Sequence, residues 1–322
     1  MHRPDEKAQN SPYFHSGELL VQERYGARDR IHAAAQRIIR DHLNEQHREF
    51  YRQLPFLIVG SVDGEGQPWA SLLAGEAGFA HALDPYVLRV EAAPFTGDPL
   101  AENLGKGAPI GLLGIDISTR RRNRISTRVA GFDGANLDLK VLQSFGNCPQ
   151  YIQVRDLVNT APSVSPTIET SECLSAEDCA LVEASHTFFI ASAHAGSPGD
   201  VRAGADVSHR GGRPGFIRVD DTCTMTVPDF VGNFVFNTLG NLVLEPRAGL
   251  LFVDFASGDV IMIACHAEII WNHEDIQAFV GAQRLLRFHI SKVVRLRAAT
   301  SLRAFGDVVF SREVQRTGTW RK

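Results

Sequence analysis

The residues best suited to holding a charged ligand lie in the second half of the chain, at Ser208-His209-Arg210-Gly211-Gly212. Two adjacent glycines let a backbone approach a ligand closely, and Arg210 presents a fork of N–H donors that suits a phosphate or a carbonyl edge. A solvated turn that carries ordinary polar residues would explain the same stretch without a ligand. The chemistry indicated is therefore the binding of an anion or a polar ring edge.

A second candidate stretch follows it and reads as a strand end, a Gly-Asn turn and the start of a helix. Its candidate residues are Val227, Pro228, Asp229, Asn233, Asn237, Thr238 and Asn241. Free N–H groups at a helix start, together with Asn and Thr side chains, suit a phosphate or a sugar-alcohol chain. A capped helix with no ligand is the alternative.

A basic cluster in the first half places four arginines within Arg120-Arg121-Arg122-Asn123-Arg124, at an expected strand-to-strand turn. A cluster this dense repels itself unless an anion is near, so Arg122 and Arg124 are candidate ligands for the same anion. A solvated basic turn is the alternative. Asn147 lies in a Gly-Asn turn and is a further candidate, whereas Cys148 beside it has no neighbouring His or acid that would make it a catalytic thiol.

The elements that must position these residues are mostly short strands. Helical spacing of apolar residues predicts one helix from Arg28 to Gln53, ended by Leu54-Pro55, after a polar arm over residues 1–27. Six strands are expected in the first half, at residues 56–62, 69–73, 86–91, 110–117, 125–132 and 137–142. Short strands at close spacing behind one helix favour a small barrel over a doubly wound sheet.

An internal repeat indicates two copies of this barrel. Residues 102–116 align without a gap on residues 240–254, a shift of 138, with identical Asn, Leu, Gly, Leu, Leu and Asp. Residues 56–61 align on residues 188–193, a shift of 132, so a net insertion falls between the first and second strands of the second copy. Repeats of this length are whole domains and not solenoid units.

The repeat and a Ser/Thr/Pro-rich linker at residues 159–167 define the expected domains. These are an arm over 1–27, a first barrel over 28–160 and a second barrel over 161–322, with a helix from a Ser175 cap to about Ala184. The hairpin of the first copy, from Trp69 to Gly75, has no basic residue. The second barrel is therefore expected to be the main ligand holder.

The composition is that of a globular protein, with 322 residues, 44% hydrophobic residues and a formal net charge of −4. The charge favours no nucleic-acid or anionic-membrane partner, no apolar run is long enough to span a bilayer, and the polar start favours a cytoplasmic protein. The five cysteines lack CxxC spacing, which predicts reduced thiols and no metal site.

The stretches SHRGGRPGF (208–216) and GNFVFNTLGNLVLEPRAGLLFVDF (232–255) resemble the pyridoxamine 5′-phosphate oxidase-like, FMN-binding split-barrel superfamily. The first half is similar to its bacterial members through QLPFLIVGS, GQPWASLLAG, LLGIDISTRRRNR and QSFGNCPQYI. The resemblance covers about residues 10–310. It implies a mainly β fold with flanking helices, built as two tandem split β-barrels with FMN at the seam between them.

The cofactor contacts that the resemblance implies fall on the two candidate stretches. They are Ser208, His209, Arg210 and Gly211, and then Val227, Pro228, Asp229, Asn233, Asn237, Thr238 and Asn241. Gly232-Asn233-Phe234 stands where relatives often have basic residues, so Arg122, Arg124 and Asn147 of the first barrel are expected to supply the missing contacts. A phosphate near two negative charges suits bidentate arginines.

The expected function is an FMN-binding flavoprotein, a flavin-dependent oxidoreductase with a substrate different from pyridoxamine phosphate. The C-terminus lacks the Arg-x-His motif that handles that substrate in the oxidases. The expected partner is a small-molecule substrate or a redox partner such as a separate reductase or ferredoxin, and a homodimer stays open. A non-catalytic flavin carrier or sensor, and a haem-binding split barrel with His209 or His289 as ligand, are the alternatives.

Overall fold

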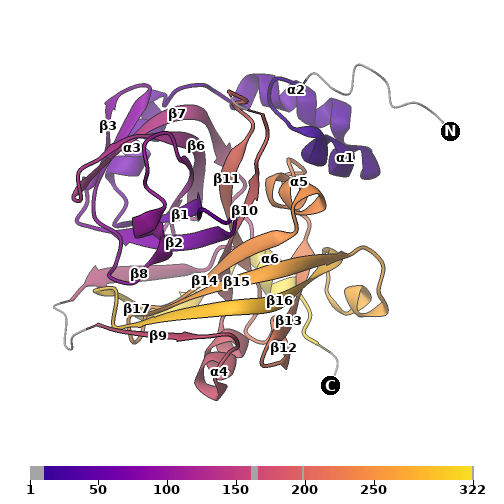
Figure 1. Ribbon diagram of the computed structural model, residues 1–322. Coiled ribbons are helices and arrows are strands. Elements are labelled where there is room, and N and C mark those ends of the chain that lie inside the picture. The colour runs from indigo at the N-terminus through magenta and orange to yellow at the C-terminus, as the bar shows by residue number, and fades with distance from the viewer. Residues whose placement is uncertain (1–10, 161–165, 198, 321–322) are drawn as a thin grey trace.

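The computed structural model describes residues 11–160, 166–197 and 199–320 (Figure 1). The first ten residues of the expected arm, residues 161–165 of the expected linker, and residues 198, 321 and 322 lie outside the described residues. The chain is mainly β, and its strands pair antiparallel in two large sheets and one two-stranded sheet.

The first sheet has the strand order β2-β1-β5-β6-β7-β4-β3. Its strands are β1 (Phe56–Val62), β2 (Pro68–Ala74), β3 (Ala80–Asp84), β4 (Val87–Glu91), β5 (Pro109–Asp116), β6 (Arg121–Phe132) and β7 (Asn136–Asn147). All six expected strands are present. β3 is an additional strand that the sequence did not predict. Its five residues show no sustained alternation of apolar and polar types, and only the first of them is fully buried. Figure 1 shows this sheet strongly curled, although its end strands do not pair with each other within the described residues.

The second sheet has the order β11-β10-β14-β15-β16-β13-β12. Its strands are β10 (Thr187–His194), β11 (Gly204–Gly211), β12 (Arg218–Asp221), β13 (Thr224–Phe230), β14 (Arg247–Asp254), β15 (Asp259–Ile270) and β16 (Ala282–Arg297), and β9 (Thr167–Ser171) pairs with the end of β16. β8 (Val154–Asn159), from the expected first barrel, pairs with β17 (Leu302–Val309) from the second. The two halves of the chain are thus joined by a shared pair of strands.

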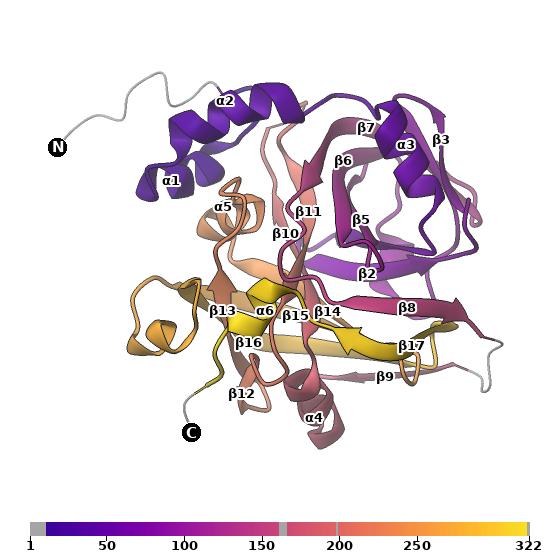
Figure 2. The same cartoon turned by 180° about the vertical axis from the view of Figure 1, so that it is seen from behind.

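The helices flank the sheets. They are α1 (Ser16–Arg24), α2 (Arg28–Ile38), α3 (Glu45–Arg52), η2 (Pro99–Glu102), α4 (Ala176–Ala184), α5 (Asn237–Leu244), η3 (Glu274–Ala278) and α6 (Arg312–Arg316). α4 confirms the helix expected after Ser175, whose side chain accepts a hydrogen bond from the backbone N–H of Asp178. In Figure 1 and Figure 2, α1 and α2 lie beside α5, so part of the expected arm straps the body.

The single helix expected over residues 28–53 is wrong, because the segment between Ile38 and Glu45 leaves the helical path. Ile39 is extended, and Arg40 forms an isolated bridge with Ser144 of β7. Asn44 then caps a new helix, accepting from the backbone N–H of His47 at 2.8 Å. The apolar spacing continues through the break, so periodicity alone could not reveal it.

The two large sheets have the same design. Their strand orders match: if nine is added to each strand number of the first sheet, so that β1 becomes β10 and β2 becomes β11, the order of the second sheet results. Leu112 pairs with Ile125 and Leu250 with Ile263, both 138 residues later. The register between the next two strands shifts after Ser126 in the first sheet and after Ala264 in the second, again 138 residues apart.

The shift of 132 expected for the first strand is one residue too large. Ile58 pairs with Leu113 and Phe189 pairs with Leu251, so the true shift is 131. This places Ser61 on Ser192. Each serine hydroxyl accepts a hydrogen bond at 3.0 Å from the amide of a repeated asparagine, Asn103 or Asn241. An alignment that is wrong by one residue assigns every side chain of a strand to the opposite face of the sheet. Because both first strands are continuous apolar runs, the sequences alone did not reveal that Ser61 aligns with Ser192.

The sheets approach each other closely at two glycines that the repeat aligns. A Cβ added to Gly111 of β5 would lie 2.3 Å from the carbonyl oxygen of Ala205 on β11. A Cβ added to Gly249 of β14 would lie 2.4 Å from the carbonyl oxygen of Pro68 on β2. Backbone therefore meets backbone across the interface, and apolar residues of both sheets form one shared core beside it.

The cysteines differ from the expectation of five reduced thiols. Cys173 and Cys223 form a disulfide, while Cys148, Cys179 and Cys265 are free. The spacing rule considers only neighbours in sequence, whereas these two cysteines are 50 residues apart and meet because the turn between β12 and β13 lies beside the segment before α4.

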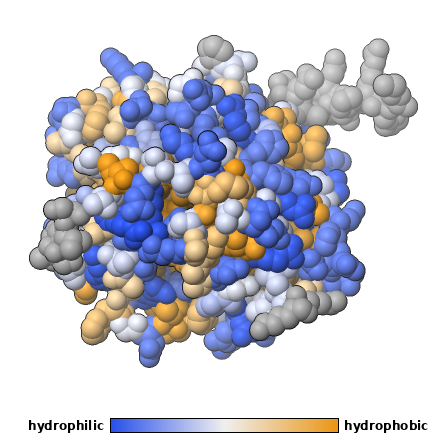
Figure 3. Space-filling model, turned by 60° about the horizontal axis from the view of Figure 1, so that its bottom comes forward, coloured by the Kyte–Doolittle hydropathy of each residue, from blue (hydrophilic) through white to orange (hydrophobic). Residues whose placement is uncertain are grey.

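The surface in Figure 3 shows apolar side chains in small groups between polar ones. Within the described ranges, none of the helices combines the length and apolar character needed to cross a bilayer.

We predict that Gly111→Ala and Gly249→Ala each lower the free energy of unfolding by about 1–3 kcal/mol, because the added methyl group must displace backbone across the interface. Urea denaturation measures this. Gly105→Ala is the matched control, since a Cβ there meets nothing within 4 Å. Equal stability of all three variants would contradict the close approach.

Candidate functional site

A pocket between the two sheets gathers most of the candidate residues. Eleven of the fourteen line it: Arg122, Arg124, Asn147, Ser208, His209, Arg210, Gly211, Asp229, Asn233, Asn237 and Thr238. They come from β6, the end of β7, β11, the end of β13, the loop that follows β13, and the start of α5. Residues from both halves of the chain therefore converge on one place.

Three candidates do not line the pocket. Val227 belongs to the apolar core of the second sheet, and Pro228 is buried in β13 opposite Leu285. Asn241 lies on the buried side of α5, where it donates to Ser192. The family resemblance implied ligand contacts for these three residues, but their side chains serve the fold.

Both basic stretches lie on strands, whereas a strand-to-strand turn was expected for the arginine cluster. Ser208 to Gly211 form the end of β11, the edge strand of the second sheet, and Arg122 and Arg124 lie on β6. Alternate residues of a strand share a face, so Arg122 and Arg124 point to the same side. The six-residue insertion falls in the loop between β10 and β11, where the shift between repeats changes from 131 to 137.

Arg124 is the central cation of the pocket and is 7% exposed. One Nη donates to the side-chain oxygen of Asn237 at 2.9 Å, and the other contacts the Ser208 hydroxyl. That hydroxyl is also 2.7 Å from the hydroxyl of Thr238. Arg124 of the first half thus ties together β11 and the first turn of α5 in the second.

The start of α5 faces the pocket with free backbone donors. Its N-cap residue, Phe236, has a left-handed backbone and provides no side-chain cap. Phe236, Asn237 and Thr238 all line the pocket. The uncapped N–H groups of a helix start and its dipole favour an anion at this position.

Arg210 is held by an acid that a second arginine supports. Its Nε is 3.1 Å from Asp229 Oδ1, and Asp229 Oδ2 is 3.4 Å from Nη1 of Arg284. Arg284 is fully buried and packs over the rings of Tyr25, Phe236 and Trp271. Sequence reasoning missed Arg284, since it is one of several basic residues of β16 and no local signal distinguishes it from the others.

Arg122 and His209 show how desolvated the cations are. Burial, with repulsion from Arg124 and Arg210, lowers the pKa of Arg122 to about 10. Burial and the same kind of repulsion hold the pKa of His209 well below its usual value, so the ring is neutral at physiological pH. Arg122 Nε donates to the Cys148 carbonyl at 2.7 Å, so Cys148 contributes its backbone.

Three buried donors at the pocket have no hydrogen-bond partner within the described residues, namely Arg124 Nε, Asn147 Nδ2 and Arg210 Nε, although the last forms the ion pair with Asp229. Such groups are costly to bury unsatisfied. Gly211 is required where it stands, because a Cβ would lie 2.1 Å from the Tyr151 carbonyl oxygen. The donor set, the clustered cations and the close backbone all suit an anion with several acceptor oxygens.

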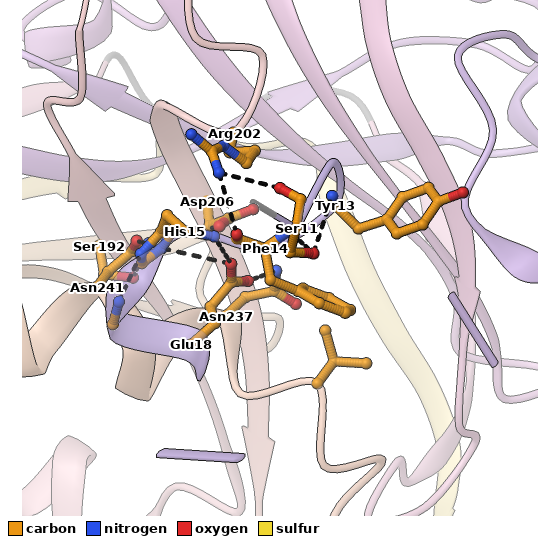
Figure 4. A network of polar contacts seen from close by, with 12 residues as sticks. Ser11, Tyr13, Phe14, His15, Glu18, Ser192, Arg202, Asp206, Asn237 and Asn241 are labelled. Atoms are coloured by element: carbon orange, nitrogen blue, oxygen red, sulfur yellow. Dashed lines mark hydrogen bonds and ion pairs between the residues drawn. The ribbon is translucent and has the colours of Figure 1, made fainter. Parts of the chain in front are cut away.

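The N-terminal helix closes one side of this arrangement (Figure 4). Glu18 of α1 accepts from Asn237 at 2.7 Å and from the His15 backbone at 2.9 Å. Burial, reinforced by Asp206, raises the pKa of Glu18 well above its usual value. Burial also raises the pKa of Asp206, despite the nearby Arg124. The strap therefore orients Asn237, and through it Arg124.

The equivalent position on the opposite side of the interface keeps a serine but has apolar residues in place of the arginines and the histidine. When the two sheets are aligned by their strand registers, Ser71 is equivalent to Ser208, Leu72 to His209 and Leu73 to Arg210. By the same alignment, Met262 is equivalent to Arg124 and Val260 to Arg122. Ser208 contacts Arg124 in the pocket, whereas the equivalent serine, Ser71, lies 4.0 Å from the sulfur of Met262. The fold offers two related positions, and one of them is equipped for an anion.

No family model and no curated protein matches the chain. Several solved structures resemble part of it. A candidate pyridoxamine 5′-phosphate oxidase from Lactobacillus delbrueckii is 17% identical with a TM-score of 0.27, over 33% of this chain and 95% of its own. HupZ of Group A Streptococcus is 14% identical with a TM-score of 0.29, over 37% and 90%. An FAD-binding protein from Mesorhizobium loti is 13% identical with a TM-score of 0.26, over 40% and 97%. Likenesses this weak do not establish a family.

We predict that Glu18→Gln reduces the pH dependence of stability. A carboxyl group whose folded pKa is raised stabilises the fold fully below its unfolded pKa, and this stability is lost as the pH rises through the folded pKa. Between about pH 5 and pH 8 the native protein should therefore lose more stability than the variant does. Urea denaturation across that range measures it.

The matched control is Glu23→Gln on the same helix, because the Glu23 side chain is 70% exposed. That variant should follow the native pH profile. A Glu18→Gln profile parallel to the native one would show that the Glu18 carboxyl is not the group that titrates.

Proposed function

We propose that the chain is an FMN-binding flavoprotein built from two tandem split barrels of duplicated origin, approximately residues 28–160 and 161–322. The common strand order, the common register and the repeated bulge support the duplication. FMN would be held in the pocket between the sheets, mainly by β11 and α5 of the second half.

The observation that carries this proposal is the convergence of Arg122, Arg124 and Arg210 on the uncapped start of α5. An FMN phosphate carries close to two negative charges near neutral pH and accepts several hydrogen bonds. Arg124 Nε and Asn147 Nδ2 are buried donors without a partner in the described part of the chain. Ser208 and Thr238 add hydroxyls. These groups fit a phosphate.

The size of the pocket limits what it encloses. Its volume is about 110 Å³, below the roughly 300–1,000 Å³ typical of pockets that bury a drug-sized ligand. It has room for a phosphate group, so the rest of a bound flavin must extend beyond it. Tyr151, Phe230 and Phe234 at its edge are aromatic surfaces suited to such a ligand.

Bound FMN would supply hydride or single-electron chemistry at its ring, while the protein supplies orientation and charge. We therefore favour a flavin-dependent oxidoreductase that exchanges electrons with a small-molecule substrate or with a redox partner such as a reductase or ferredoxin. Arg210, fixed by Asp229, is the candidate for contacting the phosphate or an anionic reduced ring.

A haem-binding function would need His209 or His289 as a ligand. His289 lines neither this pocket nor its neighbour, is about half exposed and lies 3.8 Å from Glu268. His209 lies among arginines and packs edge-on against Phe189. The cationic donor set favours a phosphate ligand over this alternative.

We predict that Arg124→Met weakens FMN binding by about 10–100-fold, because it removes charge-assisted hydrogen bonds and installs the residue found at the equivalent position, Met262. Arg210→Ala should also weaken binding. Fluorescence titration of FMN measures both. Arg121→Met is the control, because Arg121 neighbours the site on β6 but is exposed. Equal affinities in all variants, with the fold intact by circular dichroism, would remove these arginines from the site.

We predict that the protein loaded with FMN shows the absorbance bands of bound oxidised flavin and is reduced by NADH or NADPH, alone or with a reductase. Reoxidation in air then follows the return of these bands. A Soret band would instead support the haem alternative. A flavin that binds but does not turn over would indicate a carrier or sensor.

A further inference from the structure

A second cavity lies on the other side of His209 from the anion pocket. Its volume is about 410 Å³, within the range of pockets that enclose small organic ligands. Its walls are mostly apolar and include Phe56, Ile115, Ile152, Leu181, Phe189 and Phe255. They come from β1, β5, α4, β10 and the segments beside β8 and β14. The cavity is thus another product of the joining of the two halves.

One wall of this cavity carries a fixed cation, Arg155 of β8. Its Nη2 contacts Nε2 of His186. His186 Nδ1 is 3.1 Å from the Thr187 hydroxyl, which donates to Gln153 at 2.8 Å. Since burial and Arg155 lower the pKa of His186 to about 4, this histidine is neutral and accepts from Arg155. The chain of contacts orients the guanidinium without neutralising it.

The carboxylates that line the cavity are engaged elsewhere. Glu177 is 3.0 Å from Arg295 and 2.8 Å from Arg297. Asp254 accepts from the Ala256 backbone at 2.9 Å and from the Ser257 hydroxyl at 2.8 Å. Arg155 Nε is buried and has no hydrogen-bond partner within the described residues. Arg155 as a whole is half-buried and forms no salt bridge within the described residues, although the charge of Asp254 acts on it. An anionic ligand would give the guanidinium the ion pair that it lacks.

We propose that this cavity binds a largely apolar organic molecule with one anionic group, with the anion on Arg155 and the apolar part against Phe56 and Phe189. His209 lines both cavities. A molecule bound here would be separated from the anion pocket by that single ring. Its role as the substrate of a bound flavin rests on the proposed function, whereas its binding to the cavity does not.

The test uses two dyes of the same skeleton on protein without added flavin. 8-Anilinonaphthalene-1-sulfonate is anionic, and N-phenyl-1-naphthylamine lacks the sulfonate. Fluorescence titration should show saturable binding of one dye per chain, with the anionic dye binding more tightly. Arg155→Met should weaken the anionic dye by about tenfold or more and leave the neutral dye unchanged.

Two further variants locate the binding. Arg37→Met removes an exposed arginine of α2 and should change neither affinity. Ala184→Trp places a large ring in the cavity wall and should block both dyes while circular dichroism stays native. Equal affinity of the anionic dye for the native protein and Arg155→Met would overturn the proposal, as would a folded Ala184→Trp protein that binds both dyes normally.

Titration with FMN then separates this inference from the proposed function. If FMN fails to bind while the dye results hold, the flavin proposal fails and the second cavity stands. If FMN binds and the dye remains bound, the two cavities are separate, as we propose. If FMN displaces the dye from the native protein, the second cavity is part of the flavin site and the inference is overturned.

Discussion

The close approach of two backbones at Gly111 and Gly249 is the constraint on which the rest of the structure depends. At each glycine, the carbonyl oxygen of the opposing strand occupies the space where a Cβ would lie. Because no side chain separates the sheets there, β5 lies against β11 and β14 against β2. This contact brings β6 of one half beside β11 of the other, and the anion pocket forms where they meet.

An interface between two similar sheets creates two related positions, and in this protein the two positions carry different side chains. On one side Ser208 contacts Arg124, beside the free start of α5. On the other side Ser71 donates to Asp98 and lies 4.0 Å from the sulfur of Met262, which belongs to the shared apolar core. A desolvated cation needs an acceptor, whereas a thioether needs only packing. The polar position therefore suits a ligand, and the apolar one stabilises the interface.

Buried charges surround the polar position from several elements. Asp229 lies between Arg210 and the fully buried Arg284. Glu18 reaches Asn237 from the N-terminal strap. A network of this kind stabilises only while each group has its partner, so its geometry is specific. The N-terminal helix α1, the edge strand β11 and the start of α5 consequently act as one unit around the pocket.

Local sequence signals were enough to predict six strands of the first sheet, the Ser175 helix cap and eleven residues of the pocket. Strand alternation, glycine pairs and clustered arginines are properties of neighbours in the chain, and the repeat at residues 102–116 and 240–254 revealed the two related sheets. Such signals do not show which way a side chain faces. They therefore failed for Val227, Pro228 and Asn241, for the one-residue slip at Ser61, and for the break between α2 and α3.

Tertiary structure alone decided the contacts between distant segments. The disulfide between Cys173 and Cys223, the support of Arg210 by Asp229 and Arg284, and the Arg155 cavity each join residues from separate elements. No spacing rule connects them, because their proximity results from how the sheets pack. The amino-acid sequence by itself thus determined which residues have the chemistry to bind an anion. Packing of the sheets at Gly111 and Gly249 decided that Arg124 of one half meets Ser208 of the other.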